Sequence, residues 1–159
     1  MTRIYDDALR VPLWGGVGRC LTRLMGDTLP PIEFAFPGPL RDRLLDAIKS
    51  GLQTSTSSLL RECEVGEEPL PTVGVRGAAI DSTGEPVFVI ETTAVEVVRL
   101  RDVSLEHAIS EGEGYLSVAD WRAGHMRFWS SDAMRAELGT GFEVSDDSFV
   151  VLEQFLVVP

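Results

Sequence analysis

A polar corner between a helix-like stretch and an apolar, strand-like stretch is the feature that most limits how this chain can fold. Gly51 suits the end of a helix. Leu59 and Leu60 begin the apolar run, so residues 53–58 must turn the chain while carrying five hydroxyls and one amide. Such side chains are common in ordinary loops. Fixed between two regular elements, they would equally suit one wall of a preorganised polar pocket.

The composition favours one domain without metal or disulfide support. A chain of 159 residues with 44% hydrophobic content can bury one substantial core. Cys20 and Cys63 stand alone, outside any Cys-x-x-Cys spacing. Neither histidine, His107 or His125, lies near them in sequence, so the familiar zinc patterns are missing. We expect no metal, no other cofactor and two reduced thiols, as in a cytoplasmic protein.

No membrane partner is expected. The chain has no apolar run near the ~18 residues that a membrane-spanning helix requires. Asp6, Asp7 and Arg10 occupy the region where an export signal would be apolar. These observations predict a soluble, cytoplasmic protein.

The charge is acidic and uneven. The chain has 14 basic and 25 acidic side chains, a net charge of −11. Residues 1–60 hold 7 basic and 6 acidic side chains (+1), whereas residues 61–159 hold 7 and 19 (−12). Duplex DNA is therefore not an expected partner, because duplex binding draws much of its affinity from neutralised phosphates. A nucleoside, a nucleotide or a short RNA element, met through a small local site, fits this charge better.

Three helices are predicted. Pro39 suits the first position of a helix whose apolar stripe ends at Gly51. Ser104 can cap a short helix. Ser117 can begin a longer helix that should stop at Gly139, and aromatic residues at three- and four-residue spacing give that helix a buried face.

Strand patterns complete an α+β fold. Residues 1–32 lack clear periodicity and are interpreted as an irregular N-terminal cover, while residues 33–159 form the domain. The second and third strands should form an antiparallel hairpin. The predicted strands are Ser57–Cys63, Val73–Ile80, Val87–Arg99 and Phe149–Val158. This order favours a mostly antiparallel sheet, partly closed into a barrel and flanked by helices.

Five short motifs resemble the ASCH domain family in the same order, over roughly residues 33–158. They are Gly51-Leu52-Gln53-Thr54-Ser55-Thr56, Val73-Gly74, residues 91–98, Glu111-Gly112-Glu113-Gly114, and Trp121-Arg122-x-x-His125-x-x-Phe128-Trp129. The resemblance implies a PUA-like β-barrel with a cleft that binds RNA or nucleosides. Some relatives are amidohydrolases that remove an acyl group from the exocyclic amine of acetylated cytidine, and ribonuclease activity is known from others.

The resemblance assigns roles at three positions. The family signature G-x-K-x-x-T is matched here except that Gln53 replaces its lysine. In the amidohydrolases, that lysine, the threonine and a later glutamate are the proposed catalytic set, which corresponds to Gln53, Thr56 and Glu111. A carboxamide cannot act as a base near neutral pH. We expect the family's amidohydrolase activity to be weak or absent, with Thr56 and Glu111 as the candidate catalytic pair.

The other ligand-binding candidates extend this set. Thr54 and Ser57 continue the polar corner, and Glu113 could accept a hydrogen bond from a base. Tyr115 is the better candidate for stacking on a base. Each also has an ordinary interpretation as a loop or surface side chain. Arg76 could contact a phosphate or form an ion pair with one of two nearby glutamates, Glu62 or Glu64.

Aromatic residues on the long predicted helix are interpreted as core. Trp121 and Trp129 recur at helical spacing, which more often indicates packing than base stacking. His125 shares this face and is expected to be a core histidine with one ring nitrogen bonded internally.

Three functions remain open on this basis. The first is a binding module that holds its ligand with Gln53, Thr56, Ser57 and Glu111. The second is a hydrolase, amidohydrolase or ribonuclease-like, that acts on a modified nucleoside or specialised metabolite through Thr56 and Glu111. The third is a protein-interaction module, suggested by the acidity. Neither the oligomeric state nor enzymatic activity follows from the residues.

Overall fold

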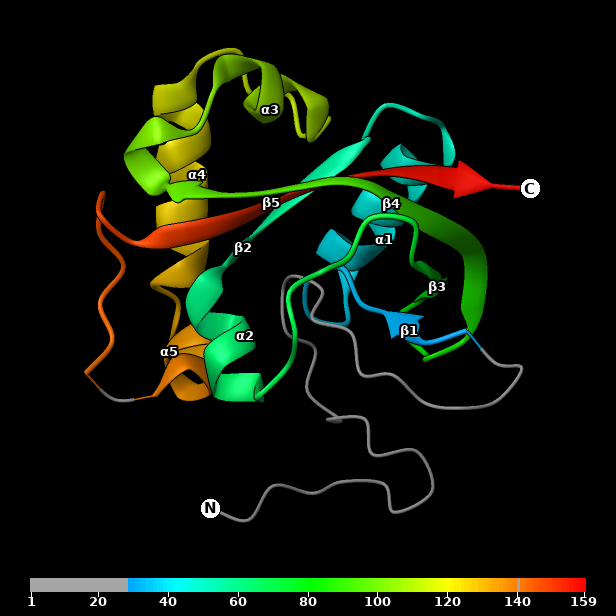
Figure 1. Ribbon diagram of the computed structural model, residues 1–159, viewed down its shortest axis with the longest axis horizontal. Coiled ribbons are helices and arrows are strands. Elements are labelled where there is room, and N and C mark those ends of the chain that lie inside the picture. The colour runs from blue at the N-terminus through cyan, green and yellow to red at the C-terminus, as the bar shows by residue number, and fades with distance from the viewer. Residues whose placement is uncertain (1–28, 140) are drawn as a thin grey trace.

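The computed structural model describes residues 29–139 and 141–159. In this part of the chain, helices flank a single sheet, as expected for an α+β fold (Figure 1). The strands are β1 (Pro31–Ile32), β2 (Ser55–Leu59), β3 (Arg76–Ile80), β4 (Pro86–Arg99) and β5 (Phe149–Val158). The helices are α1 (Pro39–Lys49), α2 (Leu60–Gly66), α3 (Leu105–Ser110), α4 (Val118–Trp129) and α5 (Asp132–Leu138), with a 3₁₀ turn at Leu100–Asp102.

The sheet has the order β1-β3-β4-β5-β2. Every neighbouring pair is antiparallel except β1 with β3. The edge strands β1 and β2 do not pair with each other, so the described sheet is open and only loosely approaches the expected partly closed barrel. A two-residue edge strand cannot bridge that gap. As predicted, β3 and β4 form a hairpin, and β5 lies inside the sheet, between β4 and β2.

The strand predicted at Ser57–Cys63 ends early. It begins at Ser55 and stops at Leu59, and α2 follows at once. The reason is local: Glu62 reaches back so that its Oε1 accepts a hydrogen bond from the Leu59 backbone N–H at 2.8 Å. This contact starts a helix where the apolar sequence favours a strand.

The single long helix predicted after Ser117 is also wrong, because it is two helices. α4 ends at Trp129 and α5 begins at Asp132. Ser131 lies between them with an extended backbone, and its hydroxyl accepts a hydrogen bond from the Met134 N–H at 3.3 Å. A serine that caps a new helix competes with continuation of the old one. The predicted capping of α3 by Ser104 is confirmed, since its hydroxyl accepts from the backbone N–H of His107.

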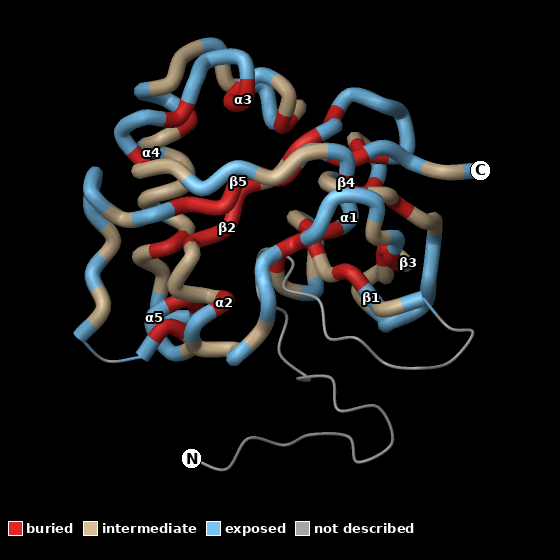
Figure 2. Tube along the Cα trace, in the orientation of Figure 1, coloured by how far each residue is buried: buried red, intermediate tan, exposed pale blue. Residues whose placement is uncertain are grey.

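Two hydrophobic clusters lie on the two sides of the fold (Figure 2). The larger cluster joins β2 and β5 to α3, α4 and α5 and includes Trp121 and Trp129, which are 0% and 1% exposed. The core interpretation of these tryptophans is therefore confirmed. The smaller cluster packs α1 against β1, β3 and β4, with Ile48 and Ile90 at its centre.

A buried arginine, Arg41, stabilises the segment that precedes α1. Arg41 is 1% exposed, and its guanidinium donates to the carbonyl oxygens of Phe34, Ala35 and Asp81. It also donates to the Glu33 carboxylate at 2.7 Å. Ala35 has a φ of 56°, which an L-residue rarely adopts. The arginine thus fixes a strained segment between β1 and α1.

The expected N-terminal cover and the expected thiols involve residues that the structure describes only in part. The predicted N-terminal cover falls mainly on residues 1–28, which lie outside the described residues. Cys63 is buried and is disulfide-bonded, so the expectation of a reduced thiol is wrong at this position, and Cys20 lies outside the described residues. Within the described ranges, none of the helices has the length and apolar character needed to cross a membrane.

Candidate functional site

The polar corner packs directly against the segment that follows α3. The backbone N–H of Thr54 donates to the Ser110 carbonyl at 2.9 Å. Gly112 has a φ of +65°, and a Cβ at this position would lie 2.5 Å from the Leu52 carbonyl oxygen. Only glycine fits here, because both its backbone conformation and its close approach exclude a side chain. The polar corner and the segment around Gly112 are far apart in the sequence and therefore lie side by side only in the fold.

Strand β2, which contains most of the polar corner, sends alternate side chains to opposite faces of the sheet. Ser55 Oγ lies 2.6 Å from Ser110 Oγ, and Ser57 Oγ donates to Glu111 Oε1 at 2.5 Å. Thr56 lies between these serines in sequence, so its side chain leaves the other face of β2. No hydrogen bond joins Thr56 to Glu111 in the described part of the chain. The hydroxyl that contacts Glu111 is that of Ser57.

Glu111 is the centre of a buried polar cluster. Its side chain is 1% exposed, and its donors come from β2, α3 and α4. Oε1 lies 3.2 Å from His107 Nε2 in addition to its bond from Ser57. Oε2 accepts from Trp121 Nε1 at 2.5 Å and lies 3.2 Å from His125 Nε2. We refer to Ser57, His107, Glu111, Trp121 and His125 as the Glu111 cluster.

The cluster holds a charged pair. Burial would raise the pKa of Glu111, but hydrogen bonds from His107, His125 and Ser57, with the charge of His125, lower it to about 2. Burial would lower the pKa of His125, but the hydrogen bond and charge of Glu111 raise it. His125 Nδ1 also lies 3.1 Å from the Trp121 carbonyl oxygen. Both ring nitrogens therefore have acceptors, as an imidazolium requires, whereas one internal bond was expected.

Ser57, His107 and Glu111 have the chemical groups of a hydrolase triad but not its geometry. In a triad, the serine and the carboxylate bind opposite nitrogens of the imidazole. Here His107 Nε2 faces both, at 2.8 Å from Ser57 Oγ and 3.2 Å from Glu111 Oε1. Ser57 is also only 3% exposed. The contacts hold β2 against α3 and do not activate the hydroxyl.

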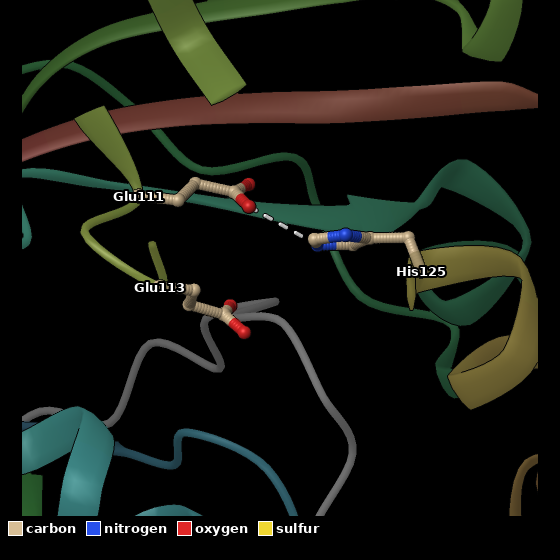
Figure 3. Close-up of side chains that lie close together, drawn as sticks. All are labelled: Glu111, Glu113 and His125. Atoms are coloured by element: carbon tan, nitrogen blue, oxygen red, sulfur yellow. Dashed lines mark ion pairs between the residues drawn. The ribbon is translucent and has the colours of Figure 1, made fainter. Parts of the chain in front are cut away.

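Glu113 forms the outer edge of the cluster. Its side chain lies beside the ion pair of Glu111 and His125, below the dashed line in Figure 3. One ligand atom from each of these residues lies within 4.8 Å of the others, a spacing compatible with metal ligands. Because Glu111 and His125 already neutralise each other, a metal ion would have to displace the His125 proton. Burial of its carboxyl group, and then the nearby charge of Glu111, raise the pKa of Glu113.

Tyr115 closes the same edge. Its ring centroid lies 6.0 Å from that of His125, which stacks on Trp121 at 4.2 Å. A Cβ at Gly124 would lie 2.2 Å from the Tyr115 hydroxyl oxygen, so α4 accepts this tyrosine only because it has a glycine there. Burial, followed by the charges of Glu113 and Glu111, raises the pKa of Tyr115. The side chain is half-buried and keeps one exposed part.

Gln53, at the position of the family lysine, lies inside the corner. It is 3% exposed, and its Nε2 donates to the Ser55 carbonyl at 3.1 Å. Its Oε1 is buried and has no hydrogen-bond partner in the structure as described. The amide therefore holds the backbone of the corner, while one acceptor remains unsatisfied.

The remaining predicted residues lie apart from the cluster. Thr54 is exposed, and its hydroxyl donates weakly to the Ser110 carbonyl at 3.4 Å. Arg76 lies on β3 and forms an ion pair with Glu91 at 2.7 Å, so neither expected partner, Glu62 or Glu64, is correct.

Sequence reasoning missed one member of the cluster, His107. It lies four residues before Glu111, a spacing that places two side chains on one face of a helix. That spacing was a usable signal. The contact of Trp121 with Glu111 had no such signal, because it joins two helices.

A surface cavity of about 420 Å³ lies on the side of α3 that faces the sheet. Its lining comes from β4, β5 and the start of α3: Ala94, Val95, Glu96, Ser104, Glu106, His107, Leu152 and Gln154. None of the site residues predicted from sequence lines it. His107 connects this cavity to the Glu111 cluster, because it lines the cavity and is hydrogen-bonded to Ser57 and Glu111.

Comparison with known proteins identifies the family. The family model for the ASCH domain matches residues 33–159. The crystal structure of an ASCH domain from Lactobacillus crispatus JV V101 is 31% identical, with a TM-score of 0.70, over 80% of this chain and 77% of that chain. A protein from Enterococcus faecalis V583 is 28% identical, with a TM-score of 0.70, over 87% of this chain and 79% of that chain. No curated protein matches the chain. The chain therefore belongs to the ASCH domain family and has its PUA-like fold.

Proposed function

We propose that this protein binds a nucleoside, a nucleotide or a short RNA element at the outer edge of the Glu111 cluster, and that it lacks the lysine-dependent amidohydrolase activity of some relatives. The observation that carries this proposal is the buried Gln53 at the lysine position. The proposal also keeps the expected absence of a duplex DNA partner.

The loss of activity follows from the chemistry of the amide. A buried lysine can act as a base because its pKa moves readily, whereas a carboxamide does not titrate near neutral pH. Loss of a general base typically costs ~10²–10⁴ in rate. Gln53 is also turned into its own corner, where its Nε2 donates to the Ser55 carbonyl.

Glu111 is equally unsuited to proton transfer. With a pKa of about 2 it is ionised near neutral pH and has no proton to deliver. Its two oxygens are surrounded by donors from the protein itself. We therefore assign Glu111 the role of a positioning residue, which orients His125 and the segment that carries Glu113.

Glu113 and Tyr115 are the groups left for a ligand. Glu113 is exposed, and a carboxylate accepts well from the exocyclic amine of cytosine. Tyr115 is half-buried beside it and offers a ring on which a base can stack. Recognition of a single base by these two groups needs no extended basic surface.

A hydrolase that uses Thr56 with Glu111 is less well supported. The side chain of Thr56 leaves the face of β2 opposite to Ser57, and Ser57 is the hydroxyl bonded to Glu111. A protein-interaction role has no contact in the described residues that favours it.

Acetylated cytidine and cytidine test the two parts of the proposal. We expect no turnover of acetylated cytidine by the wild-type protein above the uncatalysed rate, and measurable turnover by Gln53→Lys. Calorimetric titration with cytidine should give saturable binding that Glu113→Gln weakens. Glu143→Gln, which changes an exposed glutamate outside the cluster, is the matched control. Wild-type turnover that survives in the Gln53→Ala variant, or equal cytidine binding in Glu113→Gln, would contradict the proposal.

A further inference from the structure

We propose that the cavity between β4, β5 and the start of α3 is a separate binding site for a small organic cation that carries an ammonium or guanidinium group. The cavity is distinct from the Glu113 edge, and none of the predicted ligand-binding residues lines it. The proposal therefore does not depend on what that edge binds.

The walls of the cavity are rich in acceptors. The two carboxylates, Glu96 and Glu106, are exposed and come from β4 and α3, and Gln154 adds an amide. Ala94 and Gln154 are register partners, as are Glu96 and Leu152, so all four side chains share one face of the sheet. No lysine or arginine lines the cavity. A cation is attracted by this arrangement, and an anion is repelled.

His107 gives the cavity a buried acceptor. The residue is 5% exposed, and Nε2 is its only ring nitrogen with a hydrogen bond to any described residue. The Ser57 hydroxyl donates its proton to the ionised Glu111, so the oxygen of Ser57 must accept from His107 Nε2–H. In a neutral ring, this tautomer leaves a lone pair on Nδ1. Because His107 lines the cavity while Nε2 is held by the cluster, Nδ1 is the nitrogen left for a ligand.

The shape of the site favours an organic cation over a metal ion. A volume of about 420 Å³ lies in the range of small-molecule pockets and far exceeds the space that one ion fills. Ala94 and Leu152 supply apolar surface for a short carbon chain. An ammonium group has three donors, which can meet the two carboxylates and His107 Nδ1. The uneven charge, −12 over residues 61–159, attracts such a ligand from solution.

Agmatine, which carries one guanidinium and one ammonium group, is the probe. Calorimetric titration of the full chain should show saturable binding at one site. We expect Glu96→Gln and Glu106→Gln each to weaken this binding roughly fivefold, with a larger loss in the double variant. Both side chains are exposed, so the variants should fold. Glu143→Gln should bind as the wild type does.

The ring nitrogens of His107 provide a second, direct readout. Agmatine should shift the NMR resonance of His107 Nδ1 more than that of Nε2, and 1,4-butanediol, which is uncharged, should shift neither. The proposal is overturned if agmatine gives no saturable heat, or if Glu143→Gln weakens binding as much as Glu106→Gln. It is also overturned if butanediol binds equally well, or if magnesium chloride at low millimolar concentration fills the site in place of agmatine.

Discussion

Two buried charges stabilise this fold in different ways. Arg41 and Glu111 are each 1% exposed. Arg41 is held mainly by backbone carbonyl oxygens, those of Phe34, Ala35 and Asp81. Glu111 is held by side chains, which come from three different elements. The first charge ties the backbone before α1 to the turn that follows β3, and the second joins a strand to two helices.

This difference separates a structural charge from a candidate functional one. Carbonyl oxygens do not titrate, so the backbone acceptors of Arg41 are the same at any pH at which the protein folds. The surroundings of Glu111 include His125, whose pKa is raised, and they adjoin Glu113, whose pKa is also raised. Charged groups with shifted pKa values in one cluster are typical of functional sites. The cluster also adjoins the cavity, through His107.

The largest expected effect is at Arg41. Arg41→Met should lower the free energy of unfolding by about 3–5 kcal/mol, because it removes a buried charge and leaves Glu33 and the carbonyl oxygens without their donor. Denaturant unfolding measures the loss. Arg43→Met, an exposed neighbour on α1, should change stability by less than about 0.5 kcal/mol. Equal stability of the two variants would show that the arginine is not a structural charge.

A smaller loss is expected at Glu111. Glu111→Gln should lower the free energy of unfolding by about 1–3 kcal/mol, because the new NH₂ group faces donors and His125 loses its counter-charge. The same denaturant measurement at pH 5.5 applies, with Glu143→Gln as the control. If Glu111→Gln cost more than Arg41→Met, the side-chain cluster would be the main structural support, and the contrast drawn above would be reversed.

The smallest effect is a dependence on pH. The folded-state pKa of Glu111, about 2, lies below its ordinary value of 4.5, so its contribution is present above pH 4.5 and is lost as the pH falls through 2. The pKa of His125 is raised, so its contribution is present below its ordinary value of 6.5 and is lost as the pH rises through the folded-state value. The pair therefore contributes most between pH 4.5 and 6.5.

His125→Gln tests the alkaline side of this window. The wild type should lose its stability advantage over the variant as the pH rises above 6.5 and through the folded-state pKa of His125, by less than the loss in Glu111→Gln. Unfolding curves at several pH values check this expectation. The pKa of Glu113 is raised too, and the charge of His125 lowers it, so the difference between the two proteins reports the histidine together with its effect on Glu113. A stability difference that does not change with pH would mean that His125 is not charged in the fold.

Local patterns were sufficient for several elements. Pro39 begins α1 as predicted, the β3–β4 hairpin forms, and the strand predicted at Phe149–Val158 is β5. Each depends on a propensity or a spacing within one segment. The local pattern predicted the wrong element where a side chain bonds to the backbone three residues away. Glu62 and Ser131 both start helices in this way, and periodicity did not predict either start.

The members of the site were predictable in part, and the contacts among them were not. Glu111, Ser57 and Gln53 were all singled out from sequence, and Glu111 and Ser57 are in the cluster. Which hydroxyl meets Glu111 depends on the face of β2 from which it leaves, and pairing with β5 sets that face. A one-residue shift of this register would exchange Thr56 for Ser57 at the carboxylate.

By itself, the sequence determined the family, the α+β class and the substitution of an amide for the family lysine, because these are properties of residues in order. The tertiary structure decided that Ser57 contacts Glu111, that Glu111 raises the pKa of His125 and that His107 joins the cluster to a cavity. These features depend on distances between segments that are far apart in the sequence. Ser57 and His107, for example, are 50 residues apart. Such distances are set by packing and strand register, which no local pattern encodes.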